Sequence, residues 1–167
     1  RTALVTGGNS GIGLAMVQAL GRAGARVAIA ARRAEETAAA VAGLTAEAIE
    51  AMAVTVDLAR PDCAEVIAAA LRPAGWSPDI LVNAAGINLR QPFGDVTAEA
   101  FDLHMALHLR APFLLTQHFA PAMAERRWGR IITIASLQSY RAFPNSAPYG
   151  AGKGGVVQLT RATAEEW

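Results

Sequence analysis

Five short, continuously apolar segments alternate with helical patterns along the chain, and this alternation limits the possible folds more than any other feature of the sequence. The segments cover residues 2–6, 27–31, 52–56, 79–82 and 130–135. A strand that is apolar at every position is buried on both faces, and strands separated by helices are joined by right-handed crossovers. The pattern therefore predicts an α/β fold with a doubly wound parallel sheet between two helical layers, a three-layer αβα arrangement.

The helical segments carry their own start and stop signals. The predicted helices are one that follows the turn at 7–11 and is closed by Gly21 and Gly24, one over about 34–43, one from an Asp62 N-cap to about Leu71, one from a Thr97 N-cap to about Arg126, and one over about 147–166. Arg1 leads straight into a strand, and Trp167 ends the chain inside a helix. A sheet of six strands needs one more strand, so we expect a single domain over 1–167 that is truncated before its sixth strand, with the C-terminal part missing.

Composition narrows the class of protein. Apolar residues make up 53% of the chain, charged residues 17%, and the formal net charge is +1. This balance gives no sign of disorder or of a nucleic-acid partner. No apolar run approaches the roughly 18 residues of a membrane span, and no signal-peptide layout opens the chain. Cys63 is the only cysteine, so an internal disulfide is impossible; we expect a cytoplasmic protein in which this thiol is a bystander.

A glycine-rich turn, T-G-G-N-S-G-I-G at 6–13, stands between the first strand and the first helix. Glycine permits a positive φ and lets backbone N–H groups approach a pyrophosphate, and the positive end of the following helix attracts that anion. The alternative is a tight strand-to-helix turn without a ligand. Its position in a βαβ unit favours a dinucleotide site. The predicted phosphate-binding residues are Gly7, Asn9, Ser10, Gly11, Ile12 and Gly13.

The ends of the next three strands predict the remainder of a dinucleotide site. Arg32-Arg33 follows the second strand, and no acid occurs before Glu35. A carboxylate there would bind a ribose 2′-OH, whereas Arg accommodates a 2′-phosphate, so NADP(H) is favoured over NAD(H) and Arg32 is assigned to it. Solvated arginines at a helix start are the alternative. The residues expected against the adenine and the ribose, or in plain turns and caps, are Asp57, Leu58, Asn83, Ala84 and Gly86.

Tyr149 and Lys153 lie four residues apart in the last predicted helix and therefore share one of its faces. Fourteen of the fifteen basic residues are Arg, which makes the single Lys conspicuous. A free phenol is a poor acid or base near neutral pH, but an adjacent ammonium favours the phenolate. A solvated Tyr and Lys on a helix surface are the alternative. Ser136 follows the fifth strand and faces the same crevice, where it could hold a substrate oxygen; Ser139 competes for that role.

Taken together, T-G-x-x-x-G-I-G, N-A-A-G at 83–86, a serine after the fifth strand and Y-x-x-x-K resemble the short-chain dehydrogenase/reductase family, in the same order and over nearly the whole chain. The resemblance implies a Rossmann-type fold and NAD or NADP as cofactor. It implies Tyr149 as general acid/base, Lys153 as the residue that binds the nicotinamide ribose and promotes Tyr149 ionisation, and Ser136 as the residue that orients the substrate carbonyl. Members usually form homodimers or homotetramers through the two long helices.

Two departures from the family are visible. Where the family has a stretch like V-N-L-x-x-x-F, residues 107–113 read L-H-L-R-A-P-F, which places His108 at the position of the Asn. The family's Asn helps to hold a water that links the lysine to solvent. His108 can donate and accept a hydrogen bond and ordinarily titrates near neutrality, so we include it among the candidate catalytic residues; a weakened or rebuilt relay is the alternative. The second departure is the absence of the C-terminal part. In the family this part contains a Pro-Gly turn near the nicotinamide and a loop that covers the substrate.

The reaction expected is hydride transfer between the nicotinamide cofactor and a small-molecule alcohol or carbonyl, without a metal. The polar side chains of Asn88, Gln138 and Asn145, with Arg141 nearby, suit a sugar, a polyol or a sugar acid. The T-I-A-S segment at 133–136 also looks like the 3-oxoacyl-carrier-protein reductases of the family, so that substrate class stays open. A catalytically idle, cofactor-binding subunit with a regulatory or structural role is the alternative function.

Overall fold

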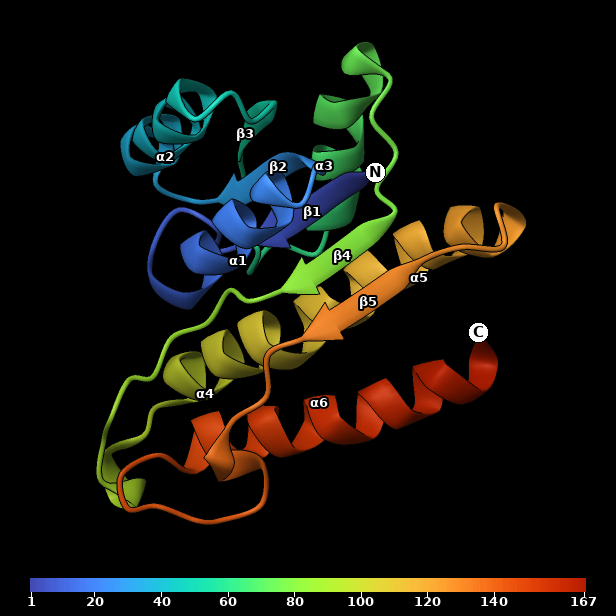
Figure 1. Ribbon diagram of the computed structural model, residues 1–167. Helices are drawn as coiled ribbons and strands as arrows, with labels where there is room; N and C mark the ends of the chain where they lie inside the picture. The colour runs from blue at the N-terminus through green and yellow to red at the C-terminus, as the bar shows by residue number, and fades with distance from the viewer.

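The computed structural model describes residues 1–167 and contains one parallel sheet of five strands. The strands are β1 Thr2–Thr6, β2 Arg26–Ala31, β3 Ala51–Thr55, β4 Ile80–Asn83 and β5 Arg130–Thr133. Their order in the sheet is β3-β2-β1-β4-β5, so the chain crosses from one half of the sheet to the other between β3 and β4 (Figure 1). Every strand pairing is parallel, which confirms the predicted doubly wound arrangement.

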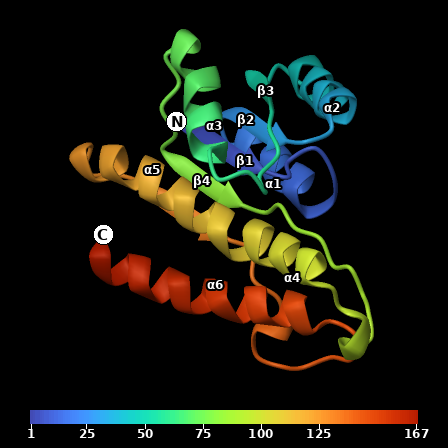
Figure 2. The same ribbon diagram turned by 180° about the vertical axis from the view of Figure 1, so that it is seen from behind.

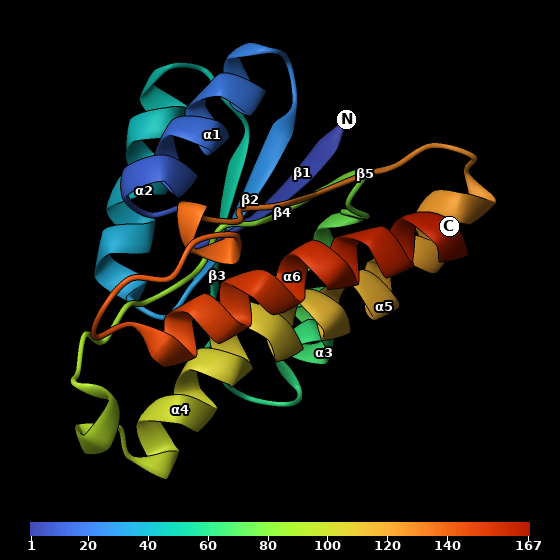
Figure 3. The same ribbon diagram turned by 90° about the horizontal axis from the view of Figure 1, so that it is seen from below.

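Helices cover both faces of the sheet. The α-helices are α1 Gly11–Arg22, α2 Ala34–Ala46, α3 Cys63–Leu71, α4 Ala98–Met105, α5 Ala111–Glu125 and α6 Ala147–Glu166. Three 3₁₀ turns, η1 Arg72–Ala74, η2 Phe93–Asp95 and η4 Leu137–Ser139, lie in the connections. Figure 3 shows α1 and α2 on one side of the sheet and α3, α5 and α6 on the other, the three expected layers. None of the helices combines the length and apolarity that a membrane crossing requires.

The two faces of the sheet have separate cores. On the α1/α2 face, Val5, Val27 and Ile29 pack with Val17 and Leu44. The larger core on the opposite face is built from sheet and helix side chains that include Leu4, Ala28, Val54, Leu81, Ile67, Leu71, Leu115 and Phe119. Successive strand residues point to opposite faces, which is why strands apolar at every position fill both cores.

The two predicted N-cap residues, Asp62 and Thr97, lie at helix starts but make different contacts. Asp62 precedes α3, but its side chain makes no capping bond. Both carboxylate oxygens instead accept hydrogen bonds from the Arg60 guanidinium, at 2.8 and 2.6 Å. Asp62 thus occupies the predicted N-cap position of α3 but forms no side-chain capping bond, because the Arg60 guanidinium two residues away competes with the backbone N–H groups for its carboxylate. Thr97 does cap α4, accepting a bond of 3.2 Å from Ala100 N.

The long predicted helix over 97–126 is continuous but locally widened. Between α4 and α5, residues Ala106–Arg110 form a π-helical turn, η3. Pro112, two residues after the end of this turn, has no N–H, and its ring would clash with the carbonyl four residues earlier in a regular α-helix. A wider turn relieves that conflict, and such π-bulges often lie at functional sites. Figure 2 shows this helix running beside α6.

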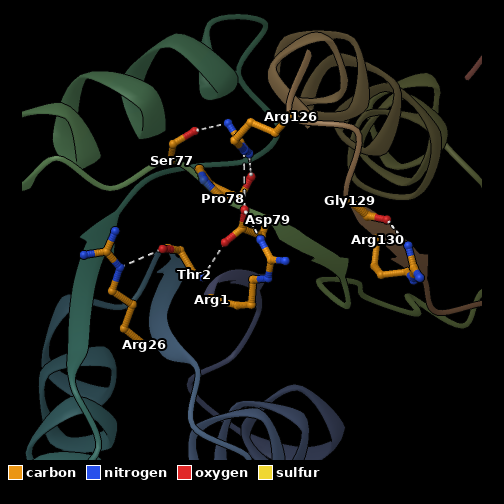
Figure 4. Close-up of polar contacts among 9 residues, drawn as sticks. All are labelled: Arg1, Thr2, Arg26, Ser77, Pro78, Asp79, Arg126, Gly129 and Arg130. Atoms are coloured by element: carbon orange, nitrogen blue, oxygen red, sulfur yellow. Dashed lines mark hydrogen bonds and ion pairs between the residues drawn. The ribbon is translucent and has the colours of Figure 1, made fainter. Parts of the chain in front are cut away.

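Asp79 connects several elements at the amino edge of the sheet, away from the predicted site (Figure 4). Its Oδ2 accepts a hydrogen bond of 3.0 Å from Thr2 N, and its Oδ1 pairs with Arg1 at 3.7 Å and with Arg126 at 3.5 Å. Arg126 also donates to Pro78 O at 2.9 Å. The carboxylate thus joins the start of β1 and β4 to the end of α5.

Candidate active site

The sequence-predicted cofactor residues converge on one groove at the carboxyl edge of the sheet. The groove has a volume of about 630 Å³ and is lined by the turns that follow β1, β2, β3 and β4. Among the predicted residues it contains Gly7, Asn9, Ser10, Ile12, Gly13, Arg32, Asp57, Leu58, Ala84 and Gly86. Asn83 lies beneath it, buried, with its side-chain amide donating to Thr133 Oγ1 at 3.3 Å. Gly11, at the start of α1, has a positive φ of 54° and is open to solvent.

The turn after β1 approaches the turn after β4 closely. Gly7 has φ of +66°, and a Cβ on this residue would lie 2.8 Å from Ala85 Cα. Thr6 secures the approach, since its Oγ1 accepts hydrogen bonds from Ala84 N at 3.1 Å and from Ala85 N at 3.2 Å. Only glycine satisfies both the dihedral angle and the space at position 7. Thr6 opens the glycine-rich motif but is not among the predicted phosphate-binding residues, because its role depends on this contact between distant segments.

The first turn of α1 suits an anionic ligand. Ser10 precedes the helix but makes no side-chain capping bond, and the first turn contains no acidic residue. The N–H groups of the first helical residues have no intrahelical acceptor, and the helix dipole places positive potential there. The glycine cradle and these donors together fit a pyrophosphate.

Two arginines, not one, line the groove after β2. Arg32 is exposed and forms no ion pair or hydrogen bond within the chain. Arg33 donates through Nη2 to Ser10 Oγ at 3.4 Å and pairs with Glu36 at 3.2 Å. Only Arg32 is among the predicted cofactor residues, although nothing in the local sequence pattern distinguishes the two side chains. Asp57 lines the groove as well, and its Oδ1 accepts from Ala59 N at 3.0 Å, which is an ordinary turn bond.

Tyr149 and Lys153 lie side by side in the first turns of α6. The Lys153 ammonium is 5.8 Å from the centre of the Tyr149 ring. Lys153 is only 6% exposed, its Nζ donates to Ile134 O at 2.5 Å, and burial lowers its pKa. The Lys153 ammonium thus lies beside the Tyr149 ring in a buried setting, where little solvent screens its charge.

Ser136 and Ser139 have different surroundings. The Oγ of Ser139 donates to Lys153 O at 2.7 Å and accepts from Ser136 N at 3.2 Å, so this hydroxyl ties η4 to α6. The Oγ of Ser136 accepts from Gln138 N at 3.1 Å, and its own proton has no acceptor within the chain. Of the two serines, Ser136 therefore keeps a donor for another molecule, whereas Ser139 positions the segment.

His108 occupies the centre of this region. It is 1% exposed and packs edge-on against Tyr149, with 5.0 Å between ring centroids. Its Nε2 lies 2.7 Å from Ile87 O, while its buried Nδ1 has no hydrogen-bond partner. Burial lowers its pKa from 6.5 to about 4, and the charge of Lys153 acts in the same direction. The expectation that His108 titrates near neutrality is therefore wrong.

The expected substrate residues lie around the same end of the sheet. Gln138 and Arg141 line a hollow of about 320 Å³ at the start of α6. Asn88 and Asn145 are exposed, and Asn145 O accepts a bond of 3.1 Å from Gln91 N, which joins their two loops. Two other hollows, beside β5 and on the α4–α5 surface, contain none of the predicted site residues.

Known proteins resemble this chain over its full length. The sequence model of the family described as short chain dehydrogenase matches residues 1–167. The gluconate 5-dehydrogenase of Gluconobacter oxydans is 39% identical over 165 residues, which cover 99% of this chain and 64% of that protein. The chain thus spans slightly less than two thirds of the length of this curated relative.

Solved structures match over the same region. A gluconate 5-dehydrogenase from Burkholderia cenocepacia, crystallised with NADP and tartrate, superposes with a TM-score of 0.92 at 34% identity, covering 100% of this chain and 66% of that one. The L-sorbose reductase of Gluconobacter frateurii, complexed with NADPH and L-sorbose, gives a TM-score of 0.95 at 26% identity, covering 99% of this chain and 64% of that one. With the family match extending over every residue, the chain belongs to the short-chain dehydrogenase family.

Proposed function

We propose that the protein is an NADP(H)-dependent oxidoreductase that interconverts an alcohol and a carbonyl in a sugar, polyol or sugar acid. The observation that carries the proposal is the arrangement of Tyr149 and Lys153 beside each other in α6, with Ser136 connected to the same helix through Ser139. This set adjoins the groove through His108, whose ring packs against Tyr149 and contacts Ile87, a residue that lines the groove. The relatives named above are gluconate dehydrogenases and a sorbose reductase, which supports the substrate class.

Each of the three side chains has one task in this proposal. Ser136 donates a hydrogen bond from its otherwise unpaired hydroxyl to the substrate oxygen and so holds the reacting carbon in place. Tyr149 exchanges a proton with that oxygen as general acid or base. The Lys153 ammonium stabilises the negative charge on Tyr149 when the proton has left, and its fixed bond to Ile134 O keeps it there.

The groove residues would hold the cofactor, which when bound supplies or accepts the hydride. The cradle at Gly7 and Gly13 and the uncapped start of α1 would bind the pyrophosphate. Arg32 and Arg33 would bind the 2′-phosphate, which favours NADP(H) over NAD(H). The adenosine and the nicotinamide ribose would lie against Asp57, Leu58, Ala84 and Gly86. The reacting end of the cofactor would lie near Asn83, Tyr149 and Lys153.

Cofactor preference is testable by direct titration of the full-length protein. Arg32→Ala should weaken NADPH binding by about tenfold or more and leave NADH binding nearly unchanged, because only NADPH offers a charged acceptor at the 2′ position. The loss should shrink in high salt, which screens an exposed guanidinium. Arg33→Ala serves as the companion variant. Equal weakening of both cofactors by both variants would contradict the NADP(H) assignment.

His108 takes the place of the family's Asn in this proposal. Its unpartnered Nδ1 lies in a buried setting, and the charge of Lys153 acts on the ring. An unpaired buried acceptor is usually satisfied by an ordered water. We therefore assign to His108 the holding of a water that connects Lys153 to solvent, with the neutral imidazole as acceptor.

The decisive experiment on the reaction uses Tyr149→Phe in a cofactor-coupled screen of polyols, sugar acids and 3-ketoesters. Removing the exchangeable proton should lower turnover by about 10²–10⁴-fold while cofactor affinity stays nearly intact. A loss below about tenfold would remove Tyr149 from its role. Preference for 3-ketoesters would support an oxoacyl reductase instead. Cofactor binding without turnover of any substrate by the unmodified protein would favour the idle subunit.

We also expect a homodimer or homotetramer. Phe101 and Phe113 on the α4–α5 surface are 42% and 45% exposed, and Leu103, Met105 and Leu109 line a hollow there. Apolar side chains gathered in this way favour contact with another copy of the chain. Light scattering of the full-length protein should give a mass of two or four chains, and a monomer at micromolar concentration would contradict the expectation.

A further inference from the structure

Two histidines one helical turn apart are completely buried beside the loop that follows β4. His104 is 0% exposed and His108 is 1% exposed, and their ring centroids are 5.8 Å apart. They belong to α4 and to the π-turn η3, and both rings face residues 87–89. Burying an imidazole costs free energy unless its nitrogens form hydrogen bonds. The hydrogen-bond partners of the two rings therefore indicate what the histidines do.

The His104 ring bridges a helix carbonyl and a loop amide. Its Nδ1 lies 2.8 Å from Ala100 O, and its Nε2 accepts from Leu89 N at 3.3 Å. A carbonyl only accepts and an amide N–H only donates, so the ring must carry its proton on Nδ1 and remain neutral. Both ring nitrogens are then satisfied.

The His108 ring holds the preceding peptide of the same loop. Its Nε2 lies 2.7 Å from Ile87 O and 3.3 Å from Ile87 N. The shorter contact is to the carbonyl, which requires a proton on Nε2 and leaves Nδ1 as an acceptor. The ring also fills the space over Gly86, where an added Cβ would lie 2.6 Å from His108 Cε1.

Asn88 stands between the two peptides that the rings hold. The loop around it has no regular secondary structure, so its backbone groups depend on such external partners. The Asn88 side chain is exposed and forms no hydrogen bond within the chain. Its amide offers two donors and an acceptor, a set that matches the hydroxyl groups of a polyol or a sugar acid.

We propose that His104 and His108 form a two-histidine clamp that fixes the 87–89 loop, and that this clamp presents Asn88 to a hydroxyl group of the substrate. The proposal rests on the proposed function and deepens it. His104 is a positioning residue here, since it acts on the substrate only through the loop. Neither His104 nor the Nε2 contact of His108 is recognisable in the sequence, because both depend on where the loop folds back over the helix.

The kinetic test compares His104→Leu with His104→Gln in the full-length protein, using the polyol or sugar acid that the unmodified enzyme turns over best. His104→Leu should raise KM by about tenfold, with kcat and the NADPH Kd changed less than about threefold, because binding of a distal hydroxyl is lost. His104→Gln should recover most of the lost affinity, since the Gln oxygen can accept from Leu89 N. Replacement of exposed His118 by Leu is the matched control and should change nothing.

A double variant tests the link to Asn88. Asn88→Ala should raise KM as much as His104→Leu does, and the two changes together should raise it no further, since one acts through the other. Independent, multiplying effects would overturn the proposal, and so would equal behaviour of His104→Leu and His104→Gln or a loss confined to kcat.

A measurement without substrate separates failure of the clamp from failure of the proposed function. Nitrogen-15 spectra of the unmodified protein should show His104 protonated on Nδ1 and His108 on Nε2 at neutral pH. Amide exchange at Leu89 should quicken by about tenfold or more in His104→Leu and much less in His104→Gln. If the tautomers differ or the Leu89 amide exchanges at an unchanged rate, the clamp is refuted even in an active enzyme. If both hold in a protein that turns over no polyol or sugar acid, the clamp stands and the assignment of Asn88 to substrate is refuted.

Discussion

Protonation of His108 should contribute to the destabilisation of the folded chain by acid. The ring is buried with Nε2 on Ile87 and has a pKa lowered from 6.5 to about 4. In the unfolded chain the ring takes up a proton near its ordinary pKa, while the folded ring stays neutral. The stability that comes from a neutral His108 is therefore complete above pH 6.5 and is lost as the pH falls through about 4.

The size of the effect follows from the interval between the two pKa values. An interval from 6.5 down to about 4 corresponds to about 3 kcal/mol in the acid limit and to about 2 kcal/mol at pH 5. Because the side chain is almost completely buried, solvent screening reduces this only slightly. Other titrating groups, the carboxylates above all, also change stability in this range. A comparison between variants cancels them.

The assay is urea unfolding of the full-length protein, followed by circular dichroism at several values between about pH 5 and pH 7. His108→Asn is expected to be less stable than the unmodified protein at pH 7, but its disadvantage should shrink by about 2 kcal/mol at pH 5. His118→Asn, on the exposed face of α5, should follow the unmodified protein throughout. Parallel curves for the unmodified protein and His108→Asn would refute the reasoning, since they would mean that the folded ring accepts its proton as readily as the unfolded one.

Three further predictions follow from single contacts. Gly7→Ala should weaken NADPH binding by about tenfold or more in a fluorescence titration, because a Cβ would lie 2.8 Å from Ala85 Cα at a φ of +66°; Gly43→Ala, with open space around it, should leave binding unchanged. Asp79→Ala should cost about 1–3 kcal/mol in urea unfolding yet spare cofactor affinity, because the carboxylate ties elements together at the opposite edge of the sheet. His108→Asn should retain substantial turnover and His108→Leu should lose much of it, because the Asn side chain can hydrogen-bond a buried water and the Leu side chain cannot. If the Leu variant is as active as the Asn variant, His108 only fills space.

Much of the fold was predictable from the sequence because its signals are local. Each strand of a sheet covered on both faces is an uninterrupted apolar run, and that run is readable without knowing its neighbours. The boundaries shifted by a residue or two, as for β5, which ends at Thr133 instead of continuing to residue 135. The diversion of the Asp62 carboxylate to Arg60 and the π-turn before Pro112 were not predicted, because each depends on a competition between nearby groups that composition does not reveal.

Part of the candidate site was likewise predictable from local sequence signals. Gly7, Gly13, Tyr149 and Lys153 are recognisable by spacing, because a cradle needs glycine next to a helix start and a turn of helix brings residues four apart together. Their place at the carboxyl edge follows from the parallel topology.

Contacts between segments distant in sequence were decided by the tertiary structure alone. The choice between Ser136 and Ser139 depends on Lys153 O, and the role of Arg33 depends on Ser10 across the groove. His104 and His108 acquire their partners only where the loop after β4 folds over the π-turn. A sequence specifies which donors and acceptors exist, but the free energy of burying each one depends on the partner that packing brings within about 3 Å, and that partner lies elsewhere in the chain.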